Sequence, residues 1–259
     1  MFVGIDLAWS QRNSTAASII SGDVGSGKLI ASRKELRSND DIVCYVLDNL
    51  GSENAVIAID APLAVPNETG IRDCDRLISR MFRKYDAGTY PANRSLLRKY
   101  GGLRGEEILQ IFQGAGFEHN PFFHSSKEAR SVVEVYPHPA MVVLFNLKKI
   151  LKYKARANRS YDLRWKELKK YQEHIASLQN YDPSLDIPEE LVGSIVTRLK
   201  GKALKSYEDL LDSVLCAYIG HYCWTHGRER CAVFGTLDGG CILTPVFNLP
   251  YDQKQRFCQ

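Results

Sequence analysis

Three short apolar runs of this chain each contain one acidic residue. The runs span 2–9 (FVGIDLAW), 55–62 (AVIAIDAP) and 131–137 (SVVEVYP), and their acids are Asp6, Asp60 and Glu134. Apolar runs of this length are typical of strands packed on both faces. An ionised carboxylate buried there costs several kcal/mol of folding free energy unless a cation compensates it. Three such acids in separate strands therefore predict a cluster that binds a cation.

A fourth contribution comes from a later run with helical periodicity, 207–226. Its residues Asp209 and Asp212 are three positions apart, which places both carboxylates on one face of the predicted helix. Carboxylates and waters are the ligands of hard divalent cations such as Mg²⁺ or Mn²⁺. Two such ions about 3.5–4 Å apart can activate a water and stabilise the leaving oxygen of a phosphodiester, without a nucleophilic side chain.

Basic side chains come from segments that flank the acidic strands. They recur at helical spacing between 72 and 84 and again in the run 148–170, with tyrosines interleaved. Charge runs are usually solvated helix faces, but basic and aromatic side chains near a metal site suit phosphate contact and base stacking. His138 either touches the substrate or simply starts a helix between two prolines. The candidate substrate-binding residues are Arg72, Arg76, His138, Lys152 and Arg156.

The acids must be positioned by a strand-rich N-terminal half. The runs 2–9, 15–21 and 28–36 are joined by turn-length connections and predict an antiparallel meander. An N-cap at 38–41 starts a helix over 42–50, and the strand 55–60 follows at a crossover distance, which predicts that it is parallel to the first. Further helices are expected at 74–84, 94–100, 106–112, 137–147, 188–200 and 207–226, and short strands at 231–234 and 241–243.

Composition limits the class of protein. The chain has 259 residues, 44% of them apolar and 25% charged, which is ordinary for a soluble globular protein. Its apolar runs are too short for a membrane span and its N-terminus lacks the pattern of a signal peptide, so we expect a cytoplasmic protein without a membrane partner. The cysteines are odd in number and include no C-x-x-C pair, which favours reduced thiols. A net charge of +4 does not by itself imply a nucleic-acid partner.

The order strand-strand-strand-helix-strand, with an acid in strands one and four and another in a late helix, resembles the RNase H-like (integrase-like) fold. More specifically, FVGIDLAW, VIAIDAPL, EVYPHPA and EDLLDSVLCA are similar to a family of unknown function, DUF429, that is predicted to contain RNase H-fold nucleases. The resemblance runs from residue 2 to about 245. It implies an α/β fold whose mixed sheet has antiparallel strands 1–3 and flanking helices. It also implies one domain over 1–259, with a helical insertion at about 64–130 and a basic helical segment at about 148–205.

The same resemblance implies that the metal-binding acids are Asp6, Asp60, Glu134 and Asp212, with Asp209 accessory. A histidine often precedes the first helix aspartate in relatives, but Glu208 stands here instead. The leading hypothesis is a Mg²⁺- or Mn²⁺-dependent nuclease acting on RNA or DNA. Asp6 would bridge two metals, Asp60 and Glu134 would hold one each, and Asp212 would complete the second site.

Two other classes of function remain open. A non-catalytic nucleic-acid-binding module on the same fold would bind in a salt-dependent way without turnover. An actin-like ATP-dependent phosphotransferase is disfavoured, because Asp6 is followed by Leu-Ala-Trp-Ser rather than by the Gly and Thr or Ser of that group. That group also needs two copies of its core fold, and the chain has no internal repeat.

Overall fold

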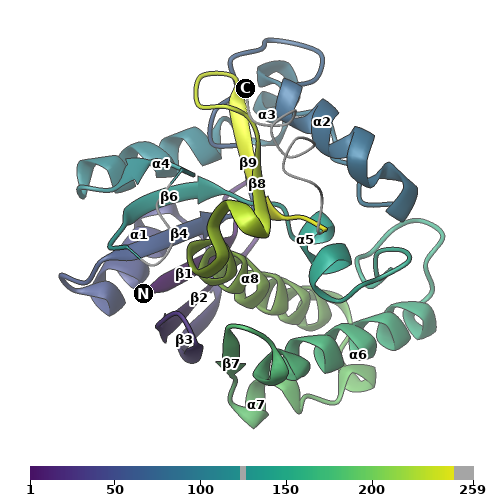
Figure 1. The fold of residues 1–259 in the computed structure, drawn as a ribbon. Coiled ribbons are helices and arrows are strands. Elements are labelled where there is room, and N and C mark those ends of the chain that lie inside the picture. The colour runs from purple at the N-terminus through teal and green to yellow at the C-terminus, as the bar shows by residue number, and fades with distance from the viewer. Residues whose placement is uncertain (123–126, 248–259) are drawn as a thin grey trace.

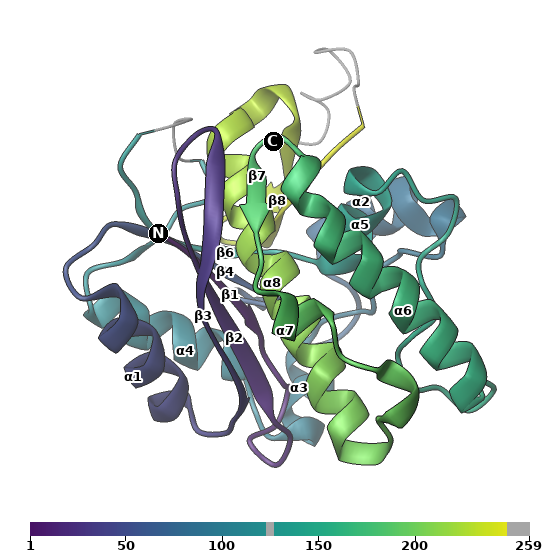
Figure 2. The ribbon, with the colours of Figure 1, turned by 90° about the horizontal axis from the view of Figure 1, so that it is seen from below.

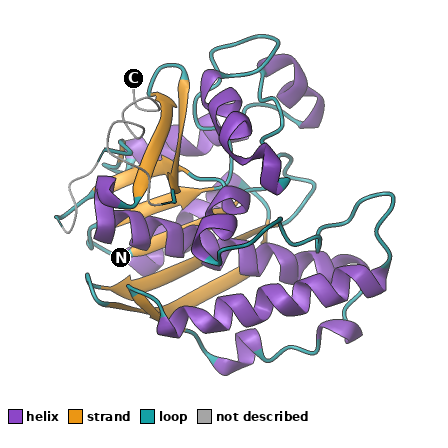
Figure 3. Ribbon diagram, turned by 45° about the vertical axis from the view of Figure 1, so that its right-hand side comes forward, coloured by secondary structure: helices purple, strands orange, loops and turns teal. Residues whose placement is uncertain are grey.

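A seven-stranded mixed sheet forms the centre of the protein, and helices cover both of its faces (Figure 1, Figure 3). The computed structural model describes residues 1–122 and 127–247. The strands are β1 (Phe2–Asp6), β2 (Thr15–Gly22), β3 (Ser26–Leu36), β4 (Ala55–Ile59), β5 (Glu118–His119), β6 (Arg130–Glu134), β7 (Ser184–Asp186), β8 (Cys231–Thr236) and β9 (Gly240–Pro245). The helices are α1 (Asn39–Leu50), α2 (Asp73–Phe82), α3 (Arg94–Tyr100), α4 (Arg104–Gly114), α5 (Pro137–Leu144), α6 (Tyr161–Ser177), α7 (Glu189–Val192) and α8 (Gly201–His226).

The order of the strands in the sheet is β5-β6-β4-β1-β2-β3-β7. Strands β1, β2 and β3 form the predicted antiparallel meander, and β4 pairs with β1 in parallel, as predicted. Strands β6 and β5 extend the parallel half beyond β4. The remaining strands, β8 and β9, form a separate antiparallel hairpin. The mixed α/β fold predicted from the sequence is therefore confirmed.

The two faces of the sheet are covered by different helices (Figure 2). Side chains alternate along a strand, so Ile5 and Ile59 pack in the apolar cluster shared with α1 and α4. Ala58 packs in the cluster shared with α8, on the opposite face. Helix α8 approaches β1 closely at Gly4, where a Cβ atom would lie 2.0 Å from the carbonyl oxygen of Ser213. Only glycine fits there, and this contact fixes the height of α8 above the sheet.

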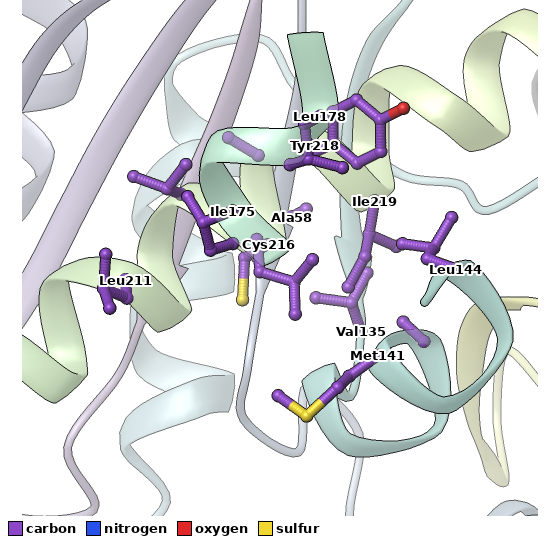
Figure 4. Close-up of a cluster of buried hydrophobic side chains, with 14 of the residues drawn as sticks. Ala58, Val135, Met141, Leu144, Ile175, Leu178, Leu211, Cys216, Tyr218 and Ile219 are labelled. Atoms are coloured by element: carbon purple, nitrogen blue, oxygen red, sulfur yellow. The ribbon is translucent and has the colours of Figure 1, made fainter. Parts of the chain in front are cut away.

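The core on the α8 face is continuous from the sheet to the C-terminal half of the chain. Figure 4 shows Cys216 and Ile219 of α8 packed among Ala58 of β4, Val135 just after β6, and Met141 of α5. A further cluster joins α2 and α5 to the β8-β9 hairpin. Because α8 contacts both the meander and the later helices, it ties the two halves of the chain together.

Several predicted boundaries were wrong. The first strand was expected to continue to Trp9, but it ends at Asp6. The chain leaves the sheet because the Ala8 amide donates to Thr15 Oγ1 (3.1 Å) and Arg104 binds the Ala8 carbonyl (2.8 Å). Strands β5 and β7 were not predicted, since two or three residues are too few to show a strand period.

The helical segments agree with the sequence to different degrees. The N-cap predicted at 38–41 is confirmed, because the Ser38 side chain accepts a hydrogen bond from the Asp41 amide. The run 188–200 contains the short α7, which ends at Val192 before its C-cap Gly193, and a 3₁₀ turn. The proposed insertion, 64–130, holds α2, α3 and α4, but its β5 joins the main sheet.

Two composition-based expectations can be compared with the structure. Among the described residues, no helix combines the length and apolar character that crossing a membrane requires. The six cysteines in that part of the chain are free thiols. The seventh, Cys258, lies outside the described residues.

Candidate metal centre

Asp6 and Asp60 lie next to each other at the carboxyl ends of two parallel strands. Ile5 of β1 is in register with Ile59 of β4, and the Asp60 amide donates to the Ile5 carbonyl at 2.9 Å. Each aspartate follows one of these paired residues, so both side chains point to the face that α8 covers. The strand residues before them are buried, whereas both aspartates are partly exposed. They therefore lie at the accessible edge of the sheet, where ligands of open α/β sheets gather.

Helix α8 brings two more aspartates to this edge. Asp209 and Asp212 are only 2% and 0% exposed. The helix is fixed above the meander by a hydrogen bond between Ser213 Oγ and Ser18 Oγ (2.7 Å). Burial, and then the charge of Asp6, raises the pKa of Asp209 to about 8. Burial and the charge of Asp6 also raise the pKa of Asp60. These mutual effects show that carboxylates from β1, β4 and α8 share one region.

Two lysines lie among these aspartates. Lys154 Nζ is 2.8 Å from Asp212 Oδ2, and Lys205 forms an ion pair with Asp209 one helical turn away. Burial opposes the charge of Lys154, but the carboxylates of Asp212, Asp6 and Asp60 raise its pKa well above the usual value. Burial likewise opposes the charge of Lys205, and Asp6 and Asp209 raise its pKa. Both lysines therefore act as counter-charges of the cluster.

The second oxygen of Asp212 is held by two tyrosines. The hydroxyl groups of Tyr153 and Tyr171 donate to Asp212 Oδ1 at 2.6 and 3.0 Å, and their rings stack with centroids 4.8 Å apart. Although burial favours the neutral acid, Lys154 and the hydrogen bonds lower the pKa of Asp212. Asp212 is thus a buried carboxylate with two hydrogen bonds on Oδ1 and an ion pair on Oδ2, although Oδ2 makes no hydrogen bond of standard geometry among the described residues.

Glu134 does not join this group. It ends β6 in register with Ile59 of β4, and after burial and the charge of Asp6 its own charge also raises the pKa of Asp60. There it forms two hydrogen bonds with the guanidinium of Arg72 (2.6 and 2.9 Å) and accepts the Leu63 amide at 2.9 Å. The expectation that Glu134 ligates a metal beside Asp6 stays a prediction, and in this structure both oxygens of Glu134 accept from Arg72.

The candidate substrate-binding residues are divided between the interior and the surface. Arg72 is 3% exposed and pairs with Asp75 as well as with Glu134, so it has no free donor at the surface. Arg76 is exposed and pairs with Asp73. Lys152 is exposed. The segment that follows α2 contacts the start of the second basic segment, because Lys149 pairs with Asp86 (3.0 Å) and the Ile150 amide donates to the Tyr85 carbonyl (2.9 Å).

His138 and Arg156 lie nearer the aspartates. Burial, and then the charge of Lys154, lowers the pKa of His138 to about 3, so its imidazole is neutral at pH 7. Its Nδ1 atom is buried and has no hydrogen-bond partner among the described residues. The exposed Arg156 places its guanidinium 5.5 Å from the centre of the Tyr90 ring.

The cluster fits a divalent cation in its chemistry and charge. Its ligands would be carboxylate oxygens, which suit Mg²⁺ or Mn²⁺. The Oδ2 atom of Asp209 is buried and has no hydrogen-bond partner within 1–122 and 127–247. The four aspartates outnumber the two lysines, so the cluster has carboxylates available for a cation. In the same residues, no three carboxylate, imidazole or thiolate groups already stand in a metal-binding arrangement. The carboxylates would therefore have to converge on the ion.

Sequence reasoning missed the groups that hold Asp212. Tyr153 and Lys154 lie in the basic run, whose composition indicated charge but not which side chains turn inward. Arg164 of α6 fixes them, because it donates to the Tyr153 carbonyl (3.0 Å) and to Glu208 (2.8 Å). The i and i+4 spacing of Lys205 and Asp209 was the one available local signal.

Comparison with known proteins identifies a family. No curated protein and no solved structure matches the chain. A family model described as "Protein of unknown function (DUF429)" matches residues 4–235.

Proposed function

This chain belongs to the DUF429 family, and we propose that it is a divalent-metal-dependent nuclease. The observation that carries the proposal is the meeting of Asp6, Asp60 and Asp209 beside the buried Asp212, a set of four aspartates that faces two lysines. We assign the metal to Asp6, Asp60 and Asp209. When bound, Mg²⁺ or Mn²⁺ would activate a water and stabilise the leaving oxygen of a phosphodiester.

The chain's own residues supply the rest of the site. Asp6 and Asp60 are accessible at the strand ends, so they can reach an ion that arrives from solvent. Asp212 holds Lys154 in place through their ion pair. In the overall hydrolysis, the water oxygen bonds to phosphorus and the bond from phosphorus to the leaving oxygen breaks. One water proton ends on the leaving hydroxyl, and the other leaves the new phosphomonoester to solvent.

The order of the strands and the nearby surface favour nucleic acid as the substrate. The order β3-β2-β1-β4-β6, with an acid ending β1 and others on α8, agrees with an RNase H-like core. Tyr90 is 58% exposed and lies under Arg156. An exposed aromatic ring beside a guanidinium can stack a base and contact a phosphate.

The test is cleavage of labelled RNA, DNA and RNA–DNA hybrid in Mg²⁺ or Mn²⁺. We expect metal-dependent cleavage of at least one substrate, and its loss in Asp6→Asn and in Asp60→Asn. Asp48→Asn on the exposed side of α1 is the matched control, since it makes the same change away from the cluster. Absence of cleavage, or cleavage that survives Asp6→Asn, would refute the proposal. Salt-dependent binding without cleavage would instead indicate a non-catalytic nucleic-acid-binding module.

A further inference from the structure

The structure already contains a fixed cation beside the candidate metal ligands, the ammonium group of Lys154. We propose that Lys154 takes the place of a second metal, so that the site binds a single divalent cation and Lys154 contacts a phosphate of the substrate. This inference rests on the proposed function and replaces the two-metal arrangement expected from the sequence.

The first argument is that both carboxylate oxygens of Asp212 already have partners. Its Oδ1 accepts hydrogen bonds from Tyr153 and Tyr171, and its Oδ2 pairs with Lys154. A second metal on Oδ2 would have to lie beside the Lys154 ammonium, which is 2.8 Å from the same oxygen, and the two cations would repel each other. Asp212, predicted to complete the second metal site, is therefore committed to the lysine.

The second argument is that the backbone around Lys154 is anchored on both sides. The Lys152 amide donates to Glu167 (3.1 Å), and the Tyr153 carbonyl accepts from Arg164 (3.0 Å). The Lys154 carbonyl accepts from Arg159 at 2.9 Å. Three consecutive residues are thus tied down although they lie between α5 and α6, outside any helix or strand. This fixation is what a preorganised charged group requires.

The third argument is charge and access. Lys154 and Lys205 already bring two positive charges to four aspartates, so one divalent cation balances the set even with every carboxylate ionised, and a second would leave an excess of positive charge. The Lys154 side chain is 30% exposed, so its ammonium can reach a ligand while it stays paired with Asp212. Lys205 is 55% exposed and pairs with Asp209 one turn along α8. Lys154 is the better-held cation of the two.

The experiment uses the whole chain and two readouts that do not need turnover. Calorimetric titration with Mn²⁺ should give one ion per wild-type chain and a second ion in Lys154→Gln, where Asp212 is released. Binding of a single-stranded oligonucleotide in EDTA should lose one phosphate contact in the same variant. The slope of log K against log salt should then fall by about 0.7.

Two further variants serve as controls. Lys166→Gln removes the same charge from an exposed position of α6 and should change neither readout. Lys154→Arg keeps the cation and should retain one Mn²⁺ and the wild-type salt slope. If Lys154→Gln fails to fold, the wild-type stoichiometry decides between one cation and two.

The measurements separate a wrong role for Lys154 from a wrong proposed function. Two Mn²⁺ ions on the wild-type chain would overturn the role of Lys154 but leave the proposed metal-dependent function standing. A Lys154→Gln variant with one ion and an unchanged salt slope would also overturn it. Absence of Mn²⁺ binding to the wild-type chain would overturn the proposed function, and this inference with it.

Discussion

Replacing Glu134 by glutamine tests whether this acid supports the fold or holds the metal. In the structure, both of its oxygens accept from Arg72, and Oε2 also accepts the Leu63 amide. A glutamine has one acceptor oxygen, so its NH₂ group would face an N–H donor of Arg72 whichever way the amide is turned. The substitution keeps the shape of the side chain and removes its charge and one acceptor.

The size of the effect follows from burial. The Arg72 and Glu134 side chains are 1% and 4% exposed, so the remaining guanidinium cannot turn to water. Breaking a buried ion pair by removing one partner costs about 3–5 kcal/mol. Asp75 still pairs with Arg72, which places Glu134→Gln at the lower end. We expect a loss of about 3 kcal/mol in the free energy of unfolding, or about 6–12 °C in Tm for a chain of this size.

Urea denaturation and calorimetric titration with Mn²⁺ measure the two properties separately. Glu134→Gln should lower stability and leave the Mn²⁺ affinity within about twofold of the wild type, which corresponds to less than 0.5 kcal/mol. Asp60→Asn should keep the stability and weaken Mn²⁺ binding. The stability is kept because burial and the charge of Asp6 already disfavour the ionised form of Asp60. The reasoning is refuted if Glu134→Gln stays stable and loses Mn²⁺ binding as Asp60→Asn does.

Two further predictions concern the packing of α8. Gly4→Ala should cost about 3 kcal/mol in urea denaturation, because the new Cβ would meet the backbone of Ser213 and Ala217. Gly25→Ala, whose Cβ has its nearest contact at 3.7 Å, is the control, and equal losses would contradict the account. His221 stacks on Phe2, its Nε2 lies 2.6 Å from the Asp23 carbonyl, and burial lowers its pKa. Because the pKa of His221 is lower in the folded protein, the unfolded chain binds a proton at His221 first as pH falls below about 6.5. The stabilising contribution of His221 is therefore lost on acidification. His221→Gln should show a smaller stability loss between pH 7.5 and 5.5, and an unchanged loss would count against the argument.

Much of the fold could be predicted because its signals are local. The apolar runs that became β1 to β4 carry strand-forming side chains over five residues or more, and Ser38 with Asp41 caps α1. Asp6 and Asp60 stand out because acids are rare in such runs. The helical spacing of Asp209 and Asp212 likewise follows from the sequence alone. These features need no knowledge of which segments meet in space.

The position of Glu134 could not be predicted in this way. Its acid lies in an apolar run like those of Asp6 and Asp60, and it ends its strand as Asp6 does. Its face depends on the register between β4 and β6, which are separated by the whole segment 60–129. A shift of one residue moves a side chain to the other face of a sheet. The local pattern contains no information on that register, and the partner Arg72 comes from the intervening segment.

The roles of the two lysines depend on still longer-range packing. Lys154 differs little in sequence from its basic neighbours, and only the ties of residues 152–154 to α6 and Arg159 turn it toward α8. This packing divides the site into two parts with different physical characters. In the first part, Asp212 is buried with Oδ1 bound by two tyrosines and Oδ2 paired with Lys154. In the second part, burial and the charge of Asp6 raise the pKa of both Asp60 and Asp209, so three carboxylates crowd one region. A fold retains such an unfavourable arrangement where an arriving cation relieves it, so the second part is where we place the metal.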